Sequence, residues 1–317
     1  MRALVAHGPD DFRLTDVAEP VQPDGGRLIE VEAAGVCAAD RMLWRGDGPW
    51  ELTWPMVPGH ELLGHDVDTG ERLTAEVKIP CGRCGWCTAG RANLCPDGAH
   101  LGSGIPGAFA DRVALPPGAL THLVPDGLPM EAAVLAEPMA CALHAVRRAA
   151  PAAGCTIAVL GFGAVGALAT YAARAEGAGR VLAVTRNPEK AALARDLGVD
   201  DVLDVQAGAL DLADVVIECS GDSAAVTLAL DLVAPGGTVV LYSVYPTPAT
   251  VDLNRIAEFK ELTVVGAHLA PGCFPDAIGL LSDVDSDAIV TAVRLIDDFR
   301  GALEPSAHLR LKEVLVP

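Results

Sequence analysis

The feature that most constrains the fold is a glycine-rich turn between an apolar run and a helix-like run. The stretch TIAVLGFGAVGALA, residues 156–169, carries the pattern G-x-G-x-x-G at Gly161, Gly163 and Gly166. The first glycine of such a pattern makes a tight turn, the second lets backbone approach a pyrophosphate, and the third allows close helix–strand packing. The helix amino terminus then offers free N–H groups to the phosphates. The turn therefore predicts dinucleotide binding rather than a purely structural role.

The rest of the chain alternates in a way that supports this prediction. From Pro138 onward, apolar runs such as RVLAVT and DVVIECS alternate with helical runs such as PEKAALARDLG. This rhythm is typical of an α/β fold with a doubly wound parallel sheet. Up to about Pro129 the chain is instead dense in Gly and Pro, and RLIEVEAAG alternates apolar with acidic residues, which predicts strands and loops. We expect two domains for 317 residues, with the strand-like ending LRLKEVLVP returning to the first.

The residues after the second apolar run of the α/β part bear on the coenzyme. NAD-binding versions of the turn usually carry an acid about 20 residues further on, which binds the ribose 2′-hydroxyl. Here Thr185 and Arg186 end and follow the run VLAVT. A hydroxyl and a guanidinium would bind a 2′-phosphate, whereas an acid would repel it. We therefore expect NADP(H) to be favoured over NAD(H), the alternative being that Arg186 is a solvated loop residue.

Four thiols within a short segment predict a closed metal site. The segment PCGRCGWCTAGRANLCP places Cys81, Cys84, Cys87 and Cys95 in the spacing C-x2-C-x2-C-x7-C. Four thiolates close a tetrahedral structural zinc site and leave no position for chemistry. A small lobe with little core of its own needs such a staple. The rival is an iron–sulfur centre, since Cys95 is followed by Pro96 as in some cluster-binding runs.

A second set of residues is suited to a catalytic metal. Cys37 in GVCAAD, the pair His60 and Glu61 in VPGHELLG, and Glu137 in LAEPMA offer a thiolate, an imidazole and carboxylates. Such mixed sites can leave one coordination position open for substrate. On a regular strand His60 and Glu61 would face opposite ways, so both reach one ion only where the backbone bends. His144 lies seven residues beyond Glu137, too far along a helix for both to bind one ion. We expect His144 to pack in the core or to support the metal ligands without binding the metal itself.

Composition excludes several classes of partner. The formal net charge of −19 argues against nucleic acid and anionic membrane surfaces, which need basic patches. The amino terminus lacks the layout of a signal peptide, and glycines and prolines break the long uncharged run after Arg148, which argues against a membrane span. Nine cysteines without such a signal indicate a reducing compartment, so we expect a cytoplasmic protein that acts on a small molecule.

The motifs GVCAAD, VPGHE, CGRCGWCTAGRANLC, AEPMACALHA and GFGAVG occur in the order found in one known family. The chain resembles the zinc-dependent medium-chain dehydrogenases/reductases over nearly its whole length, and GHE with AEP resembles the polyol and threonine dehydrogenase branch. The resemblance implies a catalytic zinc on Cys37, His60 and a glutamate, with Glu61 and Glu137 alternating between ligand and supporting roles. Asp40 matches the aspartate that hydrogen-bonds the ligand histidine in that family.

The same resemblance implies a domain plan and an assembly. A GroES-like catalytic domain would comprise residues 1–136 and 270–317, with the structural-zinc lobe at 80–97. A Rossmann domain would comprise residues 137–269. Two zinc ions per chain and a homodimer or homotetramer are also implied.

The sequence departs from the family at the expected proton relay. The position of Ala39 usually carries Ser or Thr, the histidine that commonly follows the aspartate is absent, and the segment from GHE to CGRC is short. A positioned acid–base group contributes on the order of 10²–10⁴-fold to a rate. Our hypothesis is that the proton leaves through water and Glu61, with Glu137 as the alternative.

Together these observations predict an NADP(H)-preferring, zinc-dependent oxidoreductase. It would interconvert a secondary alcohol and a ketone of a hydroxyl-rich substrate such as a polyol, sugar or aminocyclitol. One alternative is a zinc-free NADPH-dependent reductase of activated double bonds, in which Cys37 and His60 have no role. Another is a non-catalytic cofactor-binding protein.

Overall fold

The computed structural model describes residues 1–203 and 212–317, which form two compact units. The first unit comprises Met1–Ala140, Leu269–Ser282 and Val290–Pro317. The second comprises the described residues of Cys141–His268, together with Asp283–Ile289. The chain thus leaves the first unit twice, after Ala140 and after Ser282, and returns to it for its last strands.

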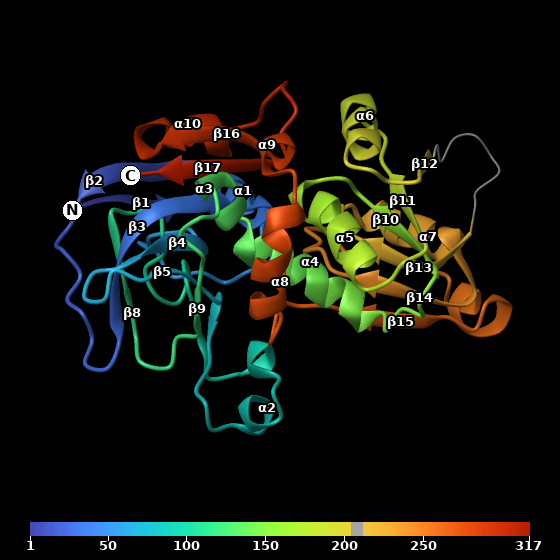
Figure 1. The fold of residues 1–317 in the computed structure, drawn as a ribbon, viewed down its shortest axis with the longest axis horizontal. Helices are drawn as coiled ribbons and strands as arrows, with labels where there is room; N and C mark the ends of the chain where they lie inside the picture. Colours follow the sequence, from blue (N-terminus) through green and yellow to red (C-terminus); the bar gives the residue numbers. More distant parts are fainter. Residues whose placement is uncertain (204–211) are drawn as a thin grey trace. The chain divides into compact units, whose positions relative to one another are not determined.

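The first unit is built on a mixed sheet in the order β16-β17-β3-β4-β5-β9, with β8 paired to β3 (Figure 1). β1 and β2 form a separate antiparallel pair. The buried side chains between these strands are mostly Leu, Val and Ala, with Phe12 and Phe109 among the largest. The strands are β1 (Arg2–Gly8), β2 (Asp11–Asp16), β3 (Arg27–Val36), β4 (Glu61–Asp66), β5 (Arg72–Ala75), β8 (Arg112–Leu115), β9 (Thr121–Leu123), β16 (Val290–Leu295) and β17 (Lys312–Val316).

The last strand of the chain is central to this sheet. β17 runs antiparallel to β3, with Leu315 opposite Ala34, and β3 pairs with β4, with Gly35 opposite Glu61. Residues from the start, the first quarter and the end of the chain are therefore neighbours. The helices of this unit are α1 (Ala38–Arg45), α3 (Met130–Ala133), α8 (Phe274–Leu280), η3 (Leu281–Asp283), η4 (Ile296–Asp298) and α10 (Phe299–Leu303), together with the start of α4 (Ala136–Arg148).

A small lobe extends from this unit between β5 and β8. It is held at its base by the short pair β6 (Lys78–Ile79) and β7 (Ala99–His100) and contains α2 (Gly85–Thr88) and η1 (Ala92–Leu94). In Figure 1 the teal α2 marks the lobe, which projects from the sheet of its unit. Neither α2 nor η1 contains a buried residue, so the lobe has little apolar core of its own.

The second unit is a parallel sheet in the order β12-β11-β10-β13-β14-β15 (Figure 1). The strand order reverses between β10 and β13, the switch point at which such sheets bind ligands. Buried Ala, Val and Leu side chains form its core. Its elements are β10 (Thr156–Leu160), α5 (Ala164–Ala175), β11 (Arg180–Val184), α6 (Pro188–Asp196), β12 (Asp201–Leu203), β13 (Ala213–Glu218), α7 (Ser223–Leu232), β14 (Val233–Leu241), η2 (Arg255–Phe259), β15 (Thr263–Gly266) and α9 (Ser286–Ile289).

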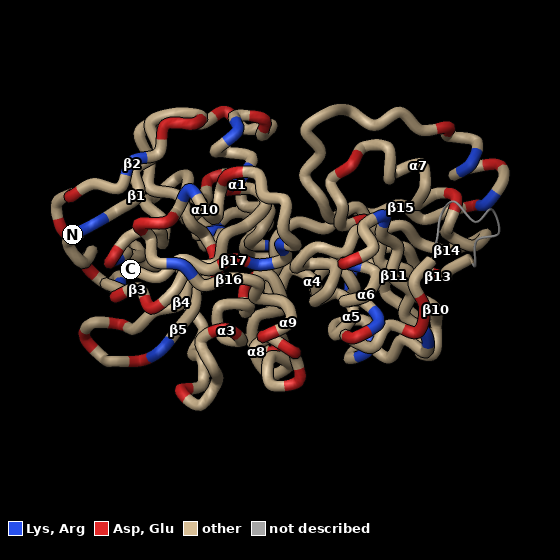
Figure 2. The backbone as a smooth tube through the Cα atoms, turned by 90° about the horizontal axis from the view of Figure 1, so that it is seen from above, with Lys and Arg blue, Asp and Glu red and all other residues tan. Residues whose placement is uncertain are grey.

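The charged residues are distributed over both units. Lys and Arg lie scattered among Asp and Glu in both units (Figure 2). Within residues 1–203 and 212–317, no helix combines the length and the apolar character needed to cross a bilayer.

Candidate active site and cofactor sites

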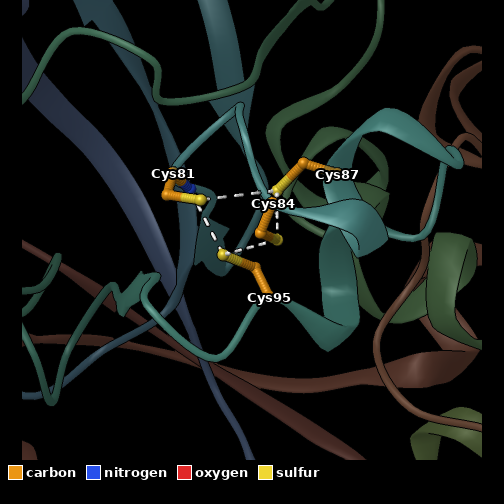
Figure 3. Close-up of side chains that lie close together, drawn as sticks. All are labelled: Cys81, Cys84, Cys87 and Cys95. Carbon is orange, nitrogen blue, oxygen red and sulfur yellow. Dashed lines mark hydrogen bonds between the residues drawn. The ribbon is translucent and has the colours of Figure 1, made fainter.

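The four cysteines of the lobe gather their sulfur atoms around one point. The Sγ of Cys87 lies 4.0 Å from that of Cys81 and 3.4 Å from that of Cys84. The Sγ of Cys84 lies 3.8 Å from that of Cys95, and Figure 3 shows all four side chains directed at one another. Sulfurs bound tetrahedrally to one zinc ion at about 2.3 Å lie roughly 3.8 Å apart. The lobe therefore has the donor set and the dimensions for a single zinc ion.

The electrostatics of the lobe also fit a cation. The backbone N–H groups of Arg83 and Cys84 lower the pKa of Cys81 to about 6. Burial, followed by contact with the sulfurs of Cys84 and Cys95, raises the pKa of Cys87 to about 12. A divalent metal bound among these sulfurs would favour the thiolate form of its ligands, because cysteine ligands must lose their protons to bind.

A second cluster forms where β3 and β4 approach α1. One ligand atom each from Cys37, His60 and Glu61 lies within 4.8 Å of the others. Gly59 has a φ of 93°, and β4 begins only at Glu61, so the backbone turns directly before the two neighbouring ligands. This turn lets the adjacent imidazole and carboxylate face the same point. A sulfur, a nitrogen and an oxygen so arranged can hold a zinc ion and leave room for a fourth ligand.

Asp40 connects two members of this cluster. One of its carboxylate oxygens accepts a 2.8 Å hydrogen bond from the backbone N–H of Cys37. The other lies 3.8 Å from Nδ1 of His60 and has no hydrogen-bond partner in the described part of the chain. Burial lowers the pKa of His60, but the charges of Asp40 and Cys37 outweigh it and raise the pKa. The hydrogen bond from His60 to Asp40 that the family resemblance implies is therefore not formed at this distance, although the carboxylate lies next to the ring nitrogen, where carboxylates support metal-ligating histidines.

Glu61 is held by a lysine that the sequence analysis did not identify. The Nζ of Lys312 lies 2.5 and 2.6 Å from the two carboxylate oxygens of Glu61 and 3.3 Å from the carbonyl oxygen of Val36. Both side chains are nearly inaccessible to solvent. Burial alone would lower the pKa of Lys312, but the charges of Glu61 and Cys37 outweigh this effect. The pKa is therefore raised, and the ammonium form is favoured. The only sequence signal was a lysine within the apolar run LRLKEVLVP.

Glycine makes room for this ion pair. Gly35 lies opposite Glu61 on β3, and a Cβ atom built at Gly35 would come within 1.9 Å of a carboxylate oxygen of Glu61. Any larger residue there would displace the carboxylate. Position 35 therefore belongs to the site, although the sequence alone gave no reason to select it.

Glu137 lies in the first turn of α4 and is almost completely buried. Its negative charge contributes to raising the pKa of both His60 and Lys312. It is outside the group of atoms that lie within 4.8 Å of one another. Ala39 brings no hydroxyl to the cluster, whereas Glu61 places a carboxylate within it.

The glycine-rich turn follows β10 at the switch point of the parallel sheet. Gly161 has a φ of 95°, and a Cβ atom there would come within 2.7 Å of Ser220. A Cβ at Gly166 would come within 2.1 Å of the carbonyl oxygen of Gly161, whereas Gly163 faces open space. The open glycine at the amino terminus of α5 leaves backbone N–H groups accessible to a pyrophosphate. The cradle fits a dinucleotide.

The residues expected to select the coenzyme lie at the carboxyl end of β11. The Oγ1 of Thr185 accepts a 3.3 Å hydrogen bond from the backbone N–H of Asn187. The side chain of Arg186 is 79% exposed, and its guanidinium lies 3.0 Å from a carboxylate oxygen of Asp222. An exposed arginine is available to a 2′-phosphate, but it must exchange this contact with Asp222 to bind one.

The two units define the class of protein to which the chain belongs. A GroES-like unit with a candidate metal cluster and a Rossmann unit with a dinucleotide cradle are the two halves of a metal-dependent dehydrogenase. Residues 23–126 match the family model of the alcohol dehydrogenase GroES-like domain, and residues 164–283 match that of zinc-binding dehydrogenases. The chain belongs to the zinc-dependent medium-chain dehydrogenases/reductases, in their polyol and threonine dehydrogenase-like branch, and is an oxidoreductase of the alcohol dehydrogenase type.

Individual relatives agree with this assignment. The chain is 34% identical to an erythritol/L-threitol dehydrogenase of Mycolicibacterium smegmatis, over 100% of this chain and 98% of the relative. It is 29% identical to a sorbitol dehydrogenase of Bacillus subtilis, over 100% and 97% of the two chains. The structure of a zinc-binding dehydrogenase from Sinorhizobium meliloti bound to NADP superposes with a TM-score of 0.92, at 31% identity, over 100% and 99% of the chains.

Proposed function

We propose that the protein interconverts a secondary alcohol and a ketone on a hydroxyl-rich substrate such as a polyol, sugar or aminocyclitol, with NADP(H) as the preferred coenzyme. The observation that carries the proposal is the convergence of Cys37, His60 and Glu61 within 4.8 Å. A zinc ion held there would act as a Lewis acid toward a substrate oxygen. The names of the relatives from M. smegmatis and B. subtilis, which are dehydrogenases of erythritol, L-threitol and sorbitol, support this substrate class.

Two zinc ions per chain are part of the proposal. One would be structural, on Cys81, Cys84, Cys87 and Cys95, and one catalytic. Cys37 and His60 would be the two constant ligands of the catalytic ion. Glu61 and Glu137 are the candidates for the carboxylate ligand. Lys312 bears on this choice, because its ammonium engages both oxygens of Glu61 and so competes with a metal for them.

Glu61 is also our candidate for removing the substrate proton through water. Both of its oxygens lie within hydrogen-bond distance of Lys312, and a carboxylate is the form of the side chain that can accept a proton. Lys312 is in turn a positioning residue, since it fixes both oxygens of Glu61 beside Cys37. Glu137 remains the alternative acceptor, because it too is buried beside His60.

The coenzyme preference rests on Thr185 and Arg186 at the end of β11. The NADP bound to the S. meliloti dehydrogenase, which is 31% identical to this chain, supports the assignment. Arg186 would release Asp222 and pair with the 2′-phosphate, a stronger partner for a guanidinium.

We further propose that the protein forms a homodimer or homotetramer. β15 is the edge strand of its sheet, and Val264 on it is 38% exposed, with the exposed side chains of Leu253 and Phe259 in the preceding segment. An unprotected edge with apolar neighbours is suited to pairing with a second copy. We also propose the cytoplasm as its compartment, because a reducing environment keeps clustered thiols available to bind metal.

A coenzyme-linked screen tests the proposal. Linear and cyclic polyols and hydroxyketones would be presented with NADP(H) or NAD(H), and metal content would be measured on the same preparation. We expect turnover of a polyol or its ketone with two zinc ions per chain. Turnover of activated double bonds with one zinc ion per chain would favour the zinc-free reductase instead, and coenzyme binding without turnover would favour a non-catalytic role.

A further inference from the structure

A buried carboxylate lies at the carboxyl end of β13, beside the glycine-rich turn. Glu218 is the last residue of this strand and has no solvent exposure. It pairs in the sheet with Leu160, which directly precedes Gly161. The loop that follows Glu218 packs against the same turn, because Ser220 is the residue that a Cβ at Gly161 would contact.

In the described part of the chain, the carboxyl group of Glu218 accepts three hydrogen bonds. One oxygen accepts a 2.6 Å hydrogen bond from the backbone N–H of Ser220 and a short one from the hydroxyl of the same residue. The other oxygen accepts a short hydrogen bond from the hydroxyl of Tyr245. An ionised carboxylate only accepts hydrogen bonds, so this set of donors fits the charged form of Glu218.

The charge has no cationic partner in the described part of the chain. Within residues 1–203 and 212–317, the hydrogen-bond partners of the Glu218 carboxylate are Ser220 and Tyr245, both uncharged. Burial, and then the hydrogen bond to Glu218, raises the pKa of Tyr245 far above its ordinary range, so this residue stays a neutral donor. A buried charge that is solvated only by neutral groups is costly for the fold and calls for another partner.

The topology identifies the half of a dinucleotide that Glu218 faces. In this fold the pyrophosphate lies at the helix that follows the first strand, and the adenosine ribose lies at the end of the next strand. Here these strands are β10 and β11. The nicotinamide half therefore extends toward the other side of the switch point, where β13 and β14 end. Glu218 ends β13, and Tyr245 lies four residues after β14.

We propose that Glu218 is the electrostatic partner of the oxidised nicotinamide ring. The ring carries a positive charge in NADP⁺ and none in NADPH, so a buried negative charge nearby stabilises the oxidised coenzyme selectively. Ser220 and Tyr245 hold the carboxylate in place without neutralising it. The arrangement favours binding of the coenzyme form that oxidises an alcohol. This inference rests on the proposed coenzyme binding, but it concerns the balance between the two coenzyme forms.

The test is the ratio of the dissociation constants of NADP⁺ and NADPH, measured by fluorescence titration without substrate. In Glu218→Gln, which keeps the shape of the side chain, we expect NADP⁺ to bind about five- to twentyfold more weakly. A change of this size is what Coulomb's law gives for two unit charges at an effective dielectric constant of about 20 and a separation on the order of 10 Å. The affinity for NADPH should stay within about twofold.

Two further variants separate charge from structure. Asp214→Asn removes one negative charge from the opposite end of β13 and should leave the ratio unchanged. Tyr245→Phe removes a hydrogen bond but keeps the charge of Glu218, so the ratio should not shift against NADP⁺. If Glu218→Gln and Tyr245→Phe weaken both coenzyme forms equally, Glu218 is only structural and the inference is wrong. If the unaltered protein binds neither form, the proposed function itself fails.

Discussion

Lys312 and Glu61 form a buried ion pair, although 251 residues separate them in the sequence. The pair exists because β17 lies against β3 and β3 against β4, which brings the two side chains together behind Cys37. It joins the end of the chain to the candidate metal site. The position of the Glu61 carboxylate in this protein therefore depends on the last strand of the chain.

Removing the lysine should destabilise the protein strongly. Lys312→Met leaves the carboxylate of Glu61 buried without a counter-charge, and we expect the free energy of unfolding to fall by about 3–5 kcal/mol. Urea titration measures the change. The double variant Lys312→Met/Glu61→Gln should recover part of the loss, since it no longer buries a lone charge. If the free energy of unfolding of Lys312→Met falls by less than about 1 kcal/mol, Glu61 does not depend on Lys312 as a buried counter-charge.

Cys81→Ser should remove one zinc ion per chain and loosen the lobe. Three thiolates and a hydroxyl bind zinc more weakly than four thiolates, and the lobe has little core without the ion. Metal analysis should give one zinc per chain instead of two, and limited proteolysis should cut between residues 81 and 95. Cys155→Ser, a change at a buried cysteine outside both clusters, is the control and should retain two ions. Unchanged metal content in Cys81→Ser would contradict the lobe site.

Restoring a hydroxyl at position 39 tests the proton route. If water and Glu61 already carry the proton, Ala39→Ser should change kcat by less than about tenfold and retain the acid-side apparent pKa of the pH–rate profile. Ala38→Ser, which adds a hydroxyl one residue away on an exposed position, is the matched control. A much faster Ala39→Ser variant that loses the acid-side apparent pKa would show that the carboxylate route is wrong.

Arg186→Ala should reduce the preference for the phosphorylated coenzyme. A charge-assisted hydrogen bond contributes about 1.5–3 kcal/mol, so kcat/KM for NADPH should fall roughly ten- to hundredfold while that for NADH stays nearly constant. Arg195→Ala removes the same charge from an exposed position in the last turn of α6 and should leave the preference intact. Equal losses with both coenzymes in Arg186→Ala would remove this residue from 2′-phosphate recognition.

Acid should destabilise the second unit through His144. Burial, followed by the charges of Arg148 and His268, lowers the pKa of His144 to about 4. The unfolded chain therefore binds a proton on this residue before the folded chain does, and stability is lost as pH falls from about 6.5 to 4. The loss should reach at most about 3 kcal/mol. In His144→Gln the unfolding free energy should vary less over this window; an unchanged pH dependence would show that His144 is not the titrating group.

Local sequence pattern was sufficient for the features that lie close together along the chain. The glycine-rich turn needs only the residues from Gly161 to Gly166, and the cysteine lobe needs only the fifteen residues from Cys81 to Cys95. In both cases the spacing itself determines which atoms can meet. The alternation of strands and helices likewise predicted the parallel sheet, since each crossover is local.

Features that depend on strand pairing across the chain could not be predicted in this way. Lys312 reaches Glu61 through the register of three strands, and Tyr245 reaches Glu218 through loops after two neighbouring strands. Nothing in the local sequence of either residue identifies its partner. The turn at Gly59 was recognised only as a condition that His60 and Glu61 would require.

The most direct test of the account is an anomalous diffraction map of the crystallised protein at the zinc absorption edge. The account predicts two peaks per chain, one among the four cysteine sulfurs of the lobe and one bound jointly by Cys37 and His60. A single peak in the lobe, with the Sγ of Cys37 and the imidazole of His60 bound to no metal, would contradict the proposed catalytic centre.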